Sequence, residues 1–196
     1  MHDLLASPLT RARWNDLVEI FGGGDGRGEC GRCWCQWWRM TRPDFAAADQ
    51  PTKKAAMEAR VAIGPAPGLL GYCGTTPVGW VQVGPRADVA EWNAAGRLTA
   101  PLDAAERADP TIWGVTCFVI RAGHRRRGHA GRLLDAAIQH ARAAGAVALD
   151  ACPVEPTRPR PASALYHGLA SQFAARGFVE IARRRPDRPL MRLMLR

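Results

Sequence analysis

Residues 124–131 bring basic side chains and glycines together at a spacing that suits a phosphate group. The run reads His-Arg-Arg-Arg-Gly-His-Ala-Gly, so three arginines are followed at once by Gly128 and then by Gly131. Glycine lets the backbone approach a ligand closely, and guanidinium groups pair well with phosphate oxygens. The pattern predicts a phosphate-binding turn or, as the alternative, an ordinary turn whose arginines are solvated.

The elements on either side of this run are those that build a phosphate site. Residues 112–120 form an apolar stretch typical of a strand, and the apolar residues after the run recur at helical spacing. They are Leu133, Leu134, Ala137, Ile138 and Ala141. A strand, a turn and a helix in this order direct unpaired N–H groups and the positive end of the helix dipole at one point, where an anion can bind.

A second group of reactive side chains lies in residues 30–38, where three cysteines and three tryptophans occur together. Cys30 and Cys33 have the spacing of half a zinc site, but no second Cys-x-x-Cys and no His-x-x-x-His follows, so we expect no metal. Tryptophans give large contact areas and a polar N–H, which suits the wall of a substrate pocket. The alternative is a loop that packs its tryptophans into a small core of its own.

The rest of the chain alternates between strand and helix patterns. In chain order we expect a strand at 2–8, helices at 10–21 and 51–63, a hairpin at 69–73 and 78–83, the strand at 112–120, a helix ending at Gly145, a strand at 146–152, a helix at 162–175 and a hairpin at 178–182 and 190–195. The strand, helix and strand over 112–152 imply a right-handed crossover and parallel pairing. We expect one α/β domain over 1–196, with a Cys/Trp-rich loop at 22–43.

Composition narrows the class of protein. The chain is 47% hydrophobic and 23% charged, and no apolar run reaches the roughly 18 residues that a membrane span needs. The N-terminus lacks the basic segment and full apolar core of a signal peptide, so we expect a cytoplasmic protein with reduced cysteines. Lys53 and Lys54 are the lysines among 27 basic residues, and the arginines are spread along the chain. A net charge of +9 distributed in this way favours an anionic ligand over nucleic acid.

The order of elements and the basic turn together resemble the GNAT superfamily of N-acetyltransferases. The family's acetyl-CoA signature, Gln/Arg-x-x-Gly-x-Gly/Ala between a strand and a helix, is matched by residues 125–130. Residues 173–180 are similar to the helix-to-strand segment that usually closes the family's fold. The resemblance covers most of residues 69–196. It implies a single mixed, mostly antiparallel sheet with a central splayed parallel strand pair flanked by helices.

The resemblance also implies acetyl-CoA as co-substrate and assigns residues to it. Backbone amides in the turn would hold the pyrophosphate, and the end of the preceding strand would pair with the pantetheine. The expected donor-binding residues are Phe118, Val119, Ile120, Arg125, Arg126, Arg127, Gly128, His129, Ala130 and Gly131. The Cys/Trp-rich loop lies where the superfamily usually builds its acceptor site. The expected substrate-binding residues are therefore Trp34, Trp37, Trp38 and Trp80.

The reaction that the resemblance implies is attack of a primary amine, carried by a small molecule or a protein, on the thioester of acetyl-CoA. A backbone N–H near Val119 or Ile120 would polarise the carbonyl. The family often uses a tyrosine to protonate the leaving thiolate, and Phe173 occupies that position here. Tyr166, about two helical turns earlier, is the catalytic residue expected in its place; the alternative is that it packs or contacts CoA.

Other roles stay open at this level. Glu91, Asp88, Glu155 and Asp150 are unranked candidates for the general base that takes the amine proton. Because Phe173 cannot donate a proton, a catalytically degenerate CoA-binding sensor or interaction module is the alternative function. The expected partner is the amine acceptor, with neither nucleic acid nor membrane, and the resemblance makes a homodimer a further expectation.

Overall fold

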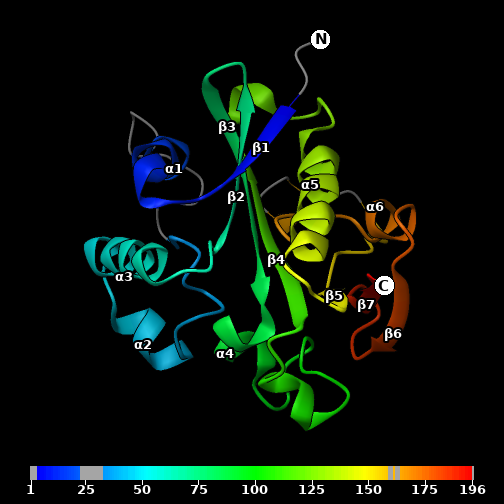
Figure 1. The fold of residues 1–196 in the computed structure, drawn as a ribbon. Coiled ribbons are helices and arrows are strands. Elements are labelled where there is room, and N and C mark those ends of the chain that lie inside the picture. Colours follow the sequence, from blue (N-terminus) through cyan, green and yellow to red (C-terminus); the bar gives the residue numbers. More distant parts are fainter. Residues whose placement is uncertain (1–3, 23–32, 159–160, 162–163, 196) are drawn as a thin grey trace.

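The computed structural model describes residues 4–22, 33–158, 161 and 164–195, so expectations for Cys30 and for positions 162–163 lie outside the described residues. In the described chain, seven strands form one sheet with the order β1-β2-β3-β4-β5-β7-β6 (Figure 1). The strands are β1 (Leu4–Pro8), β2 (Gly68–Cys73), β3 (Thr76–Pro85), β4 (Ile112–Ile120), β5 (Ala148–Ala151), β6 (Val179–Arg183) and β7 (Pro189–Met194).

Strand β4 and strand β5 pair in parallel, whereas the other neighbouring strands in the sheet pair antiparallel. The parallel register runs from Ile112 beside Ala148 to Val115 beside Ala151. Strand β5 then ends, while β4 continues to Ile120. The expected mixed sheet with a splayed parallel pair is therefore confirmed. Beyond Val115, β4 stays paired with β3 but has no strand on the side of β5, and this part of β4 (Thr116–Ile120) is called its unpaired end below.

Helices cover both faces of the sheet (Figure 1). They are α1 (Trp14–Gly22), α2 (Arg42–Ala47), α3 (Gln50–Ile63), α4 (Ala90–Asn93), α5 (His129–Ala143) and α6 (Ala170–Ala174). Side chains alternate between the faces along a strand, so Val81 packs with α5 whereas its neighbour Trp80 packs with α1 and α3. None of the described helices is both long and apolar enough to cross a membrane.

Two stretches differ from the expected pattern. The helix predicted at 162–175 is wrong in its first half, because the described helix there is α6 alone. Gly168 has φ +78, which ends any helix, and the Tyr166 carbonyl accepts a hydrogen bond from the Phe118 N–H on β4. The second difference is α2, which begins inside the loop expected at 22–43. The Thr41 hydroxyl caps it by accepting from the Asp44 N–H.

A buried ionic cluster joins β5 to the segment that follows β3. The side chains of Arg86 and Asp150 form an ion pair and are both fully buried. Arg86 Nε donates to Asn93 Oδ1 at 2.9 Å, and Arg192 Nε donates to the second Asp150 oxygen at 2.7 Å. A buried carboxylate with two guanidinium partners and satisfied hydrogen bonds holds these elements at a fixed distance.

Candidate active site

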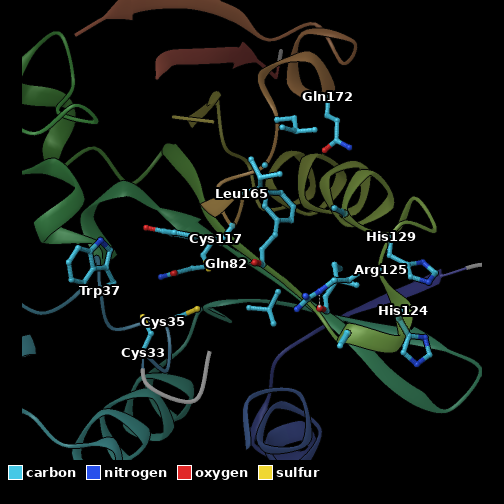
Figure 2. Close-up of a pocket in the computed structure, with 18 of the residues that line it drawn as sticks. Cys33, Cys35, Trp37, Gln82, Cys117, His124, Arg125, His129, Leu165 and Gln172 are labelled. Atoms are coloured by element: carbon cyan, nitrogen blue, oxygen red, sulfur yellow. Dashed lines mark hydrogen bonds between the residues drawn. The ribbon is translucent and has the colours of Figure 1, made fainter. Parts of the chain in front are cut away.

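One cavity of about 1020 Å³ passes the unpaired end of β4. Its basic end is formed by His124, Arg125, Arg126, Gly128, His129 and Ala130. Its aromatic end is formed by Cys33, Cys35, Trp37, Trp38 and Phe45. Figure 2 shows the labelled residues of the aromatic end at the left and those of the basic end at the right. Residues Cys117–Ile120 and the segment with Leu165 and Tyr166 line the space between them.

The basic end is the N-terminus of α5. Gly128 is the N-cap residue with φ +79, and Arg126 also has a positive φ of 57, so the turn folds tightly over the helix start. No side chain caps the first N–H groups, and the first turn carries no acidic residue. The free N–H groups and the helix dipole therefore remain available for an anion, which is what a diphosphate requires.

The individual residues of the turn take different positions. Arg125 Nε donates to the Ile120 carbonyl at 3.0 Å, which fastens the turn to the end of β4. Arg126 lines the cavity, whereas Arg127 and Gly131 are outside its lining. The Gly131 carbonyl accepts from Arg176 Nη2 at 3.0 Å, and a Cβ at Gly131 would come within 3.0 Å of the same nitrogen. Glycine at this position accommodates Arg176.

The unpaired end of β4 presents one backbone N–H to the cavity. The Arg121 N–H donates to Val78 on β3, so the N–H groups of alternate residues face β3. Those of Phe118 and Ile120 face the other way. The Phe118 N–H donates to the Tyr166 carbonyl at 2.6 Å, and the Thr116 carbonyl lies 2.9 Å from His167 Nδ1. The segment around Tyr166 thus replaces β5 as far as Phe118, and Ile120 lies beyond it.

The four tryptophans expected at the acceptor site separate into two pairs. Trp37 and Trp38 line the cavity, and the Trp37 ring makes an edge contact with Phe45 at 5.0 Å between centroids. Trp34 and Trp80 are buried in the core between α1 and the sheet, where Trp34 stacks on Phe21 at 5.5 Å. The first pair thus lies where a pocket wall would be and the second pair packs in the core, so acceptor binding by Trp37 and Trp38 stays a prediction.

The thiols at the aromatic end differ in their ionisation. Hydrogen bonds from Cys117 and from Trp80 Nε1, the latter at 3.2 Å, lower the pKa of Cys35 although burial opposes them. Burial raises the pKa of Cys33 to about 11. The surroundings of Cys35 therefore favour its thiolate, whereas those of Cys33 favour the neutral thiol.

Burial favours the neutral forms of the phenol and the imidazoles around the cavity. Burial raises the pKa of Tyr166, so its phenol stays protonated. Burial lowers the pKa of His167 to about 3. Burial and the neighbouring arginines lower the pKa values of His124 and His129 at the basic end.

The four carboxylates considered as general bases are all ion-paired. Asp88 pairs with Arg60, Glu155 with Arg183, and Glu91 with both Arg42 and Arg97, while Asp150 belongs to the buried cluster. None of them is among the described residues that line the cavity. An amine bound there would meet aromatic, thiol, amide and phenol groups.

The sequence of the chain matches the model of the acetyltransferase (GNAT) family over residues 34–170. The chain belongs to the GNAT family of acetyltransferases. The match includes the end of β4, the basic turn and the aromatic end of the cavity except Cys33, so most of the site described above lies within the matched residues. A comparison with curated protein sequences finds no match.

Solved structures support the same fold. yncA from Salmonella typhimurium, solved with acetyl-CoA, is 16% identical, with 98% of this chain and 94% of that chain covered and a TM-score of 0.56. The paia N-acetyltransferase from Thermoplasma acidophilum, in complex with coenzyme A, is 9% identical, with 98% and 99% covered and a TM-score of 0.53. A ribosomal-protein-alanine N-acetyltransferase from Brucella melitensis is 16% identical, with 97% and 99% covered and a TM-score of 0.55. At these identities the likeness shows the GNAT fold alone.

Several lining residues of this GNAT protein are absent from the sequence-based set. Cys117, Leu165, Gln172, Gln82 and Phe45 all line the cavity. Cys117 and Gln82 lie opposite each other on β4 and β3, so strand register could have placed them together. Leu165 belongs to a segment predicted as helix, and no local pattern reveals that it runs beside β4.

Proposed function

We propose that the protein transfers the acetyl group of acetyl-CoA to a primary amine bound against Trp37 and Trp38. The observation that carries the proposal is that one cavity joins the uncapped N-terminus of α5 to an aromatic wall past the unpaired end of β4. In this reaction the amine nitrogen bonds to the acetyl carbon and the carbon–sulfur bond breaks. The amine loses a proton and the departing thiolate gains one.

The donor would lie from the basic end toward the unpaired end of β4. The free N–H groups at the start of α5 and the guanidinium of Arg126 suit its diphosphate. Bound there, the donor supplies an activated acyl group as a thioester. The Ile120 N–H points away from β3 and toward this space, so it is suited to polarise the thioester carbonyl.

Tyr166 is the proposed acid for the departing thiolate. Its ring lines the cavity, and burial keeps its phenol protonated because the charged form is disfavoured. Phe173 cannot take this role. It is fully buried and packs against Phe118 and Phe178.

The surroundings of the acceptor favour an amine on an apolar or aromatic carrier. The wall consists of Trp37, Trp38 and Phe45, and the Arg42 guanidinium lies 3.6 Å from the centre of the Trp37 ring. No carboxylate lines the described cavity, so nothing in it selects for a permanently cationic acceptor. The amine proton leaves through water or through a neutral side chain.

The experiment compares Arg126→Glu with Arg127→Glu. Both variants change the net charge equally, but Arg126 lines the cavity whereas Arg127 does not. We expect Arg126→Glu to raise the Kd for acetyl-CoA at least about tenfold, and Arg127→Glu to raise it much less. Calorimetry of acetyl-CoA binding measures both. Equal effects would mean that the general field of the protein, rather than this turn, attracts the donor.

Turnover is then measured by thiol release from acetyl-CoA with a panel of aromatic amines, aliphatic amines and peptides. Acetyl transfer to one class of amine supports the proposed enzyme. Tight binding of acetyl-CoA with no turnover on any acceptor would overturn it and favour a CoA-binding sensor.

A further inference from the structure

Three potential metal ligands from separate elements meet near the start of α5. Cys73 is the last residue of β2, His124 ends the short turn after β4, and His129 is the first residue of α5. One ligand atom from each side chain lies within 4.8 Å of the others. Figure 2 places His124 and His129 side by side at the far end of the cavity from Trp37.

The spacing within the cluster is that of a metal site with nitrogen and sulfur ligands. Cys73 Sγ lies 3.7 Å from His129 Nε2. Bond lengths of about 2.3 Å for zinc–sulfur and about 2.05 Å for zinc–nitrogen place two ligands of a tetrahedral ion about 3.6 Å apart. The two atoms therefore already lie at the separation that a shared zinc ion would require.

The imidazoles also carry polar atoms that the surrounding protein does not satisfy. His129 is only 5% exposed. The Nδ1 atoms of His124 and His129 are buried and have no hydrogen-bond partner in the part of the chain that is described. His129 faces the thiol with Nε2, so its own Nδ1 is not the ligand atom. Buried polar atoms without partners cost free energy, and the unpartnered Nδ1 of His124 is a nitrogen left available for a ligand.

The charges around the cluster limit which ion can bind. Arg121, Arg127 and Arg132 face the two imidazoles, and Arg121 is held by Glu19 at 2.5 Å. A hard ion held by general attraction to negative charge would be repelled. A thiolate with two imidazoles instead forms strong bonds to a borderline or soft ion, and it offers no oxygen ligand for magnesium or calcium.

We propose that Cys73, His124 and His129 bind one Zn²⁺ ion through one thiolate and two imidazoles, with a fourth position left to water. The thiol proton is released to solvent on binding. The site is separate from the Cys-x-x-Cys spacing of residues 30–33, and the amides at the start of α5 keep their anion-binding role. Local spacing in the sequence does not reveal it, because its ligands come from three elements.

The test is direct binding of Zn²⁺, and of Co²⁺ as a spectroscopic probe, to the reduced, chelator-treated protein. We expect one equivalent of Zn²⁺ and, with Co²⁺, the visible bands of a tetrahedral ion together with a thiolate charge-transfer band. Cys73→Ser should lower the affinity at least about 100-fold and remove the charge-transfer band. His124→Asn is a second variant that tests the same site, and it should lower the affinity for Zn²⁺ by a similar factor.

Matched controls distinguish this site from others. Cys152→Ser removes a buried cysteine elsewhere, and His140→Asn removes a histidine of α5 whose Nε2 also lacks a partner. Both should bind Zn²⁺ as the parent protein does. The proposal fails if Zn²⁺ does not bind, or if one equivalent survives in Cys73→Ser and His124→Asn but is lost in Cys33→Ser.

Discussion

At the scale of single residues, Tyr166 lines the cavity whereas Phe173 is buried in the core. Phe173 occupies the position that the sequence resemblance implies for the acid, and its ring lies in the core. Tyr166 reaches the cavity because its carbonyl is fixed to the Phe118 N–H at 2.6 Å. The backbone of β4, beyond the end of β5, thus holds Tyr166, the proposed acid, at the cavity.

Replacing Tyr166 by phenylalanine tests the acid role. If the CoA thiol resembles cysteine, with a pKa of about 8.5, releasing it unprotonated at pH 7 costs about 2 kcal/mol. We therefore expect Tyr166→Phe to lower kcat about 10- to 30-fold at pH 7. Burial keeps the pKa of Tyr166 above its ordinary value, so the parent protein retains its acid across pH 7–9. The thiolate needs no proton above pH 8.5, and the deficit should shrink to less than about threefold at pH 9.

The other tyrosine provides the control. The Tyr72 hydroxyl donates to Asp16 at 2.6 Å and is not part of the cavity lining. Tyr72→Phe should leave the pH profile of kcat unchanged. A deficit in Tyr166→Phe that is the same at pH 7 and pH 9 would argue for a packing role.

At the scale of elements, the segment from Cys33 to Met40 both closes the core and forms the aromatic wall. Trp34 and Cys35 have positive φ angles of 47 and 52, which is uncommon for residues other than glycine. This turn sends Trp34 toward Phe21 and leaves Trp37 at the cavity. Strain in the turn is offset by the burial of the Trp34 ring.

Alanine substitutions at Trp37 and Trp34 should separate the two roles. We expect Trp37→Ala to raise the KM for the amine about tenfold or more while the Kd for acetyl-CoA changes less than about twofold. Trp34→Ala should instead lower the free energy of unfolding by about 3–5 kcal/mol, because it empties a buried site. Steady-state kinetics and urea denaturation measure these effects. A loss of stability in Trp37→Ala equal to that in Trp34→Ala would contradict the separation.

Much of this arrangement can be predicted from the sequence because it depends on local patterns. The sequence shows directly the apolar run of β4, the basic turn and the helical spacing of apolar residues in α5. Their order then predicts the crossover to the parallel strand β5. The path of residues 164–169 is different. Its composition favours a helix, but the backbone groups of Phe118 and Thr116 need partners after β5 ends, and those long-range hydrogen bonds decide the structure. The same limit applies to which tryptophans face the cavity, since the turn at Trp34 decides it.

At the scale of the whole molecule, the buried cluster around Asp150 sets where the parallel pair separates. Asp150 lies one residue before the end of β5 and is bonded to Arg86 and Arg192, which come from opposite directions. These bonds anchor β5 next to β4 as far as Ala151. We therefore expect the cavity to depend on an ion pair outside its lining.

Asp150→Asn tests this dependence. Loss of the carboxylate leaves the fully buried Arg86 without its counter-charge, and we expect the free energy of unfolding to fall by about 3–5 kcal/mol. Glu180→Gln, which weakens an exposed pair with Arg183, should cost less than about 1 kcal/mol. Urea denaturation at pH 7 compares the two variants. A cost for Asp150→Asn as small as that for Glu180→Gln would show that the cluster does not anchor β5.

Arginine, rather than lysine, in the turn before α5 protects the turn from acetylation by the donor. A thioester donor acylates exposed lysine amines without any enzyme, and acetylation removes the charge of a lysine. A guanidinium stays protonated and is a poor nucleophile, so it keeps its charge beside such a donor. The described residues that line the cavity include arginines but no lysine. A phosphate site built in this way resists inactivation by the reagent that it is proposed to hold.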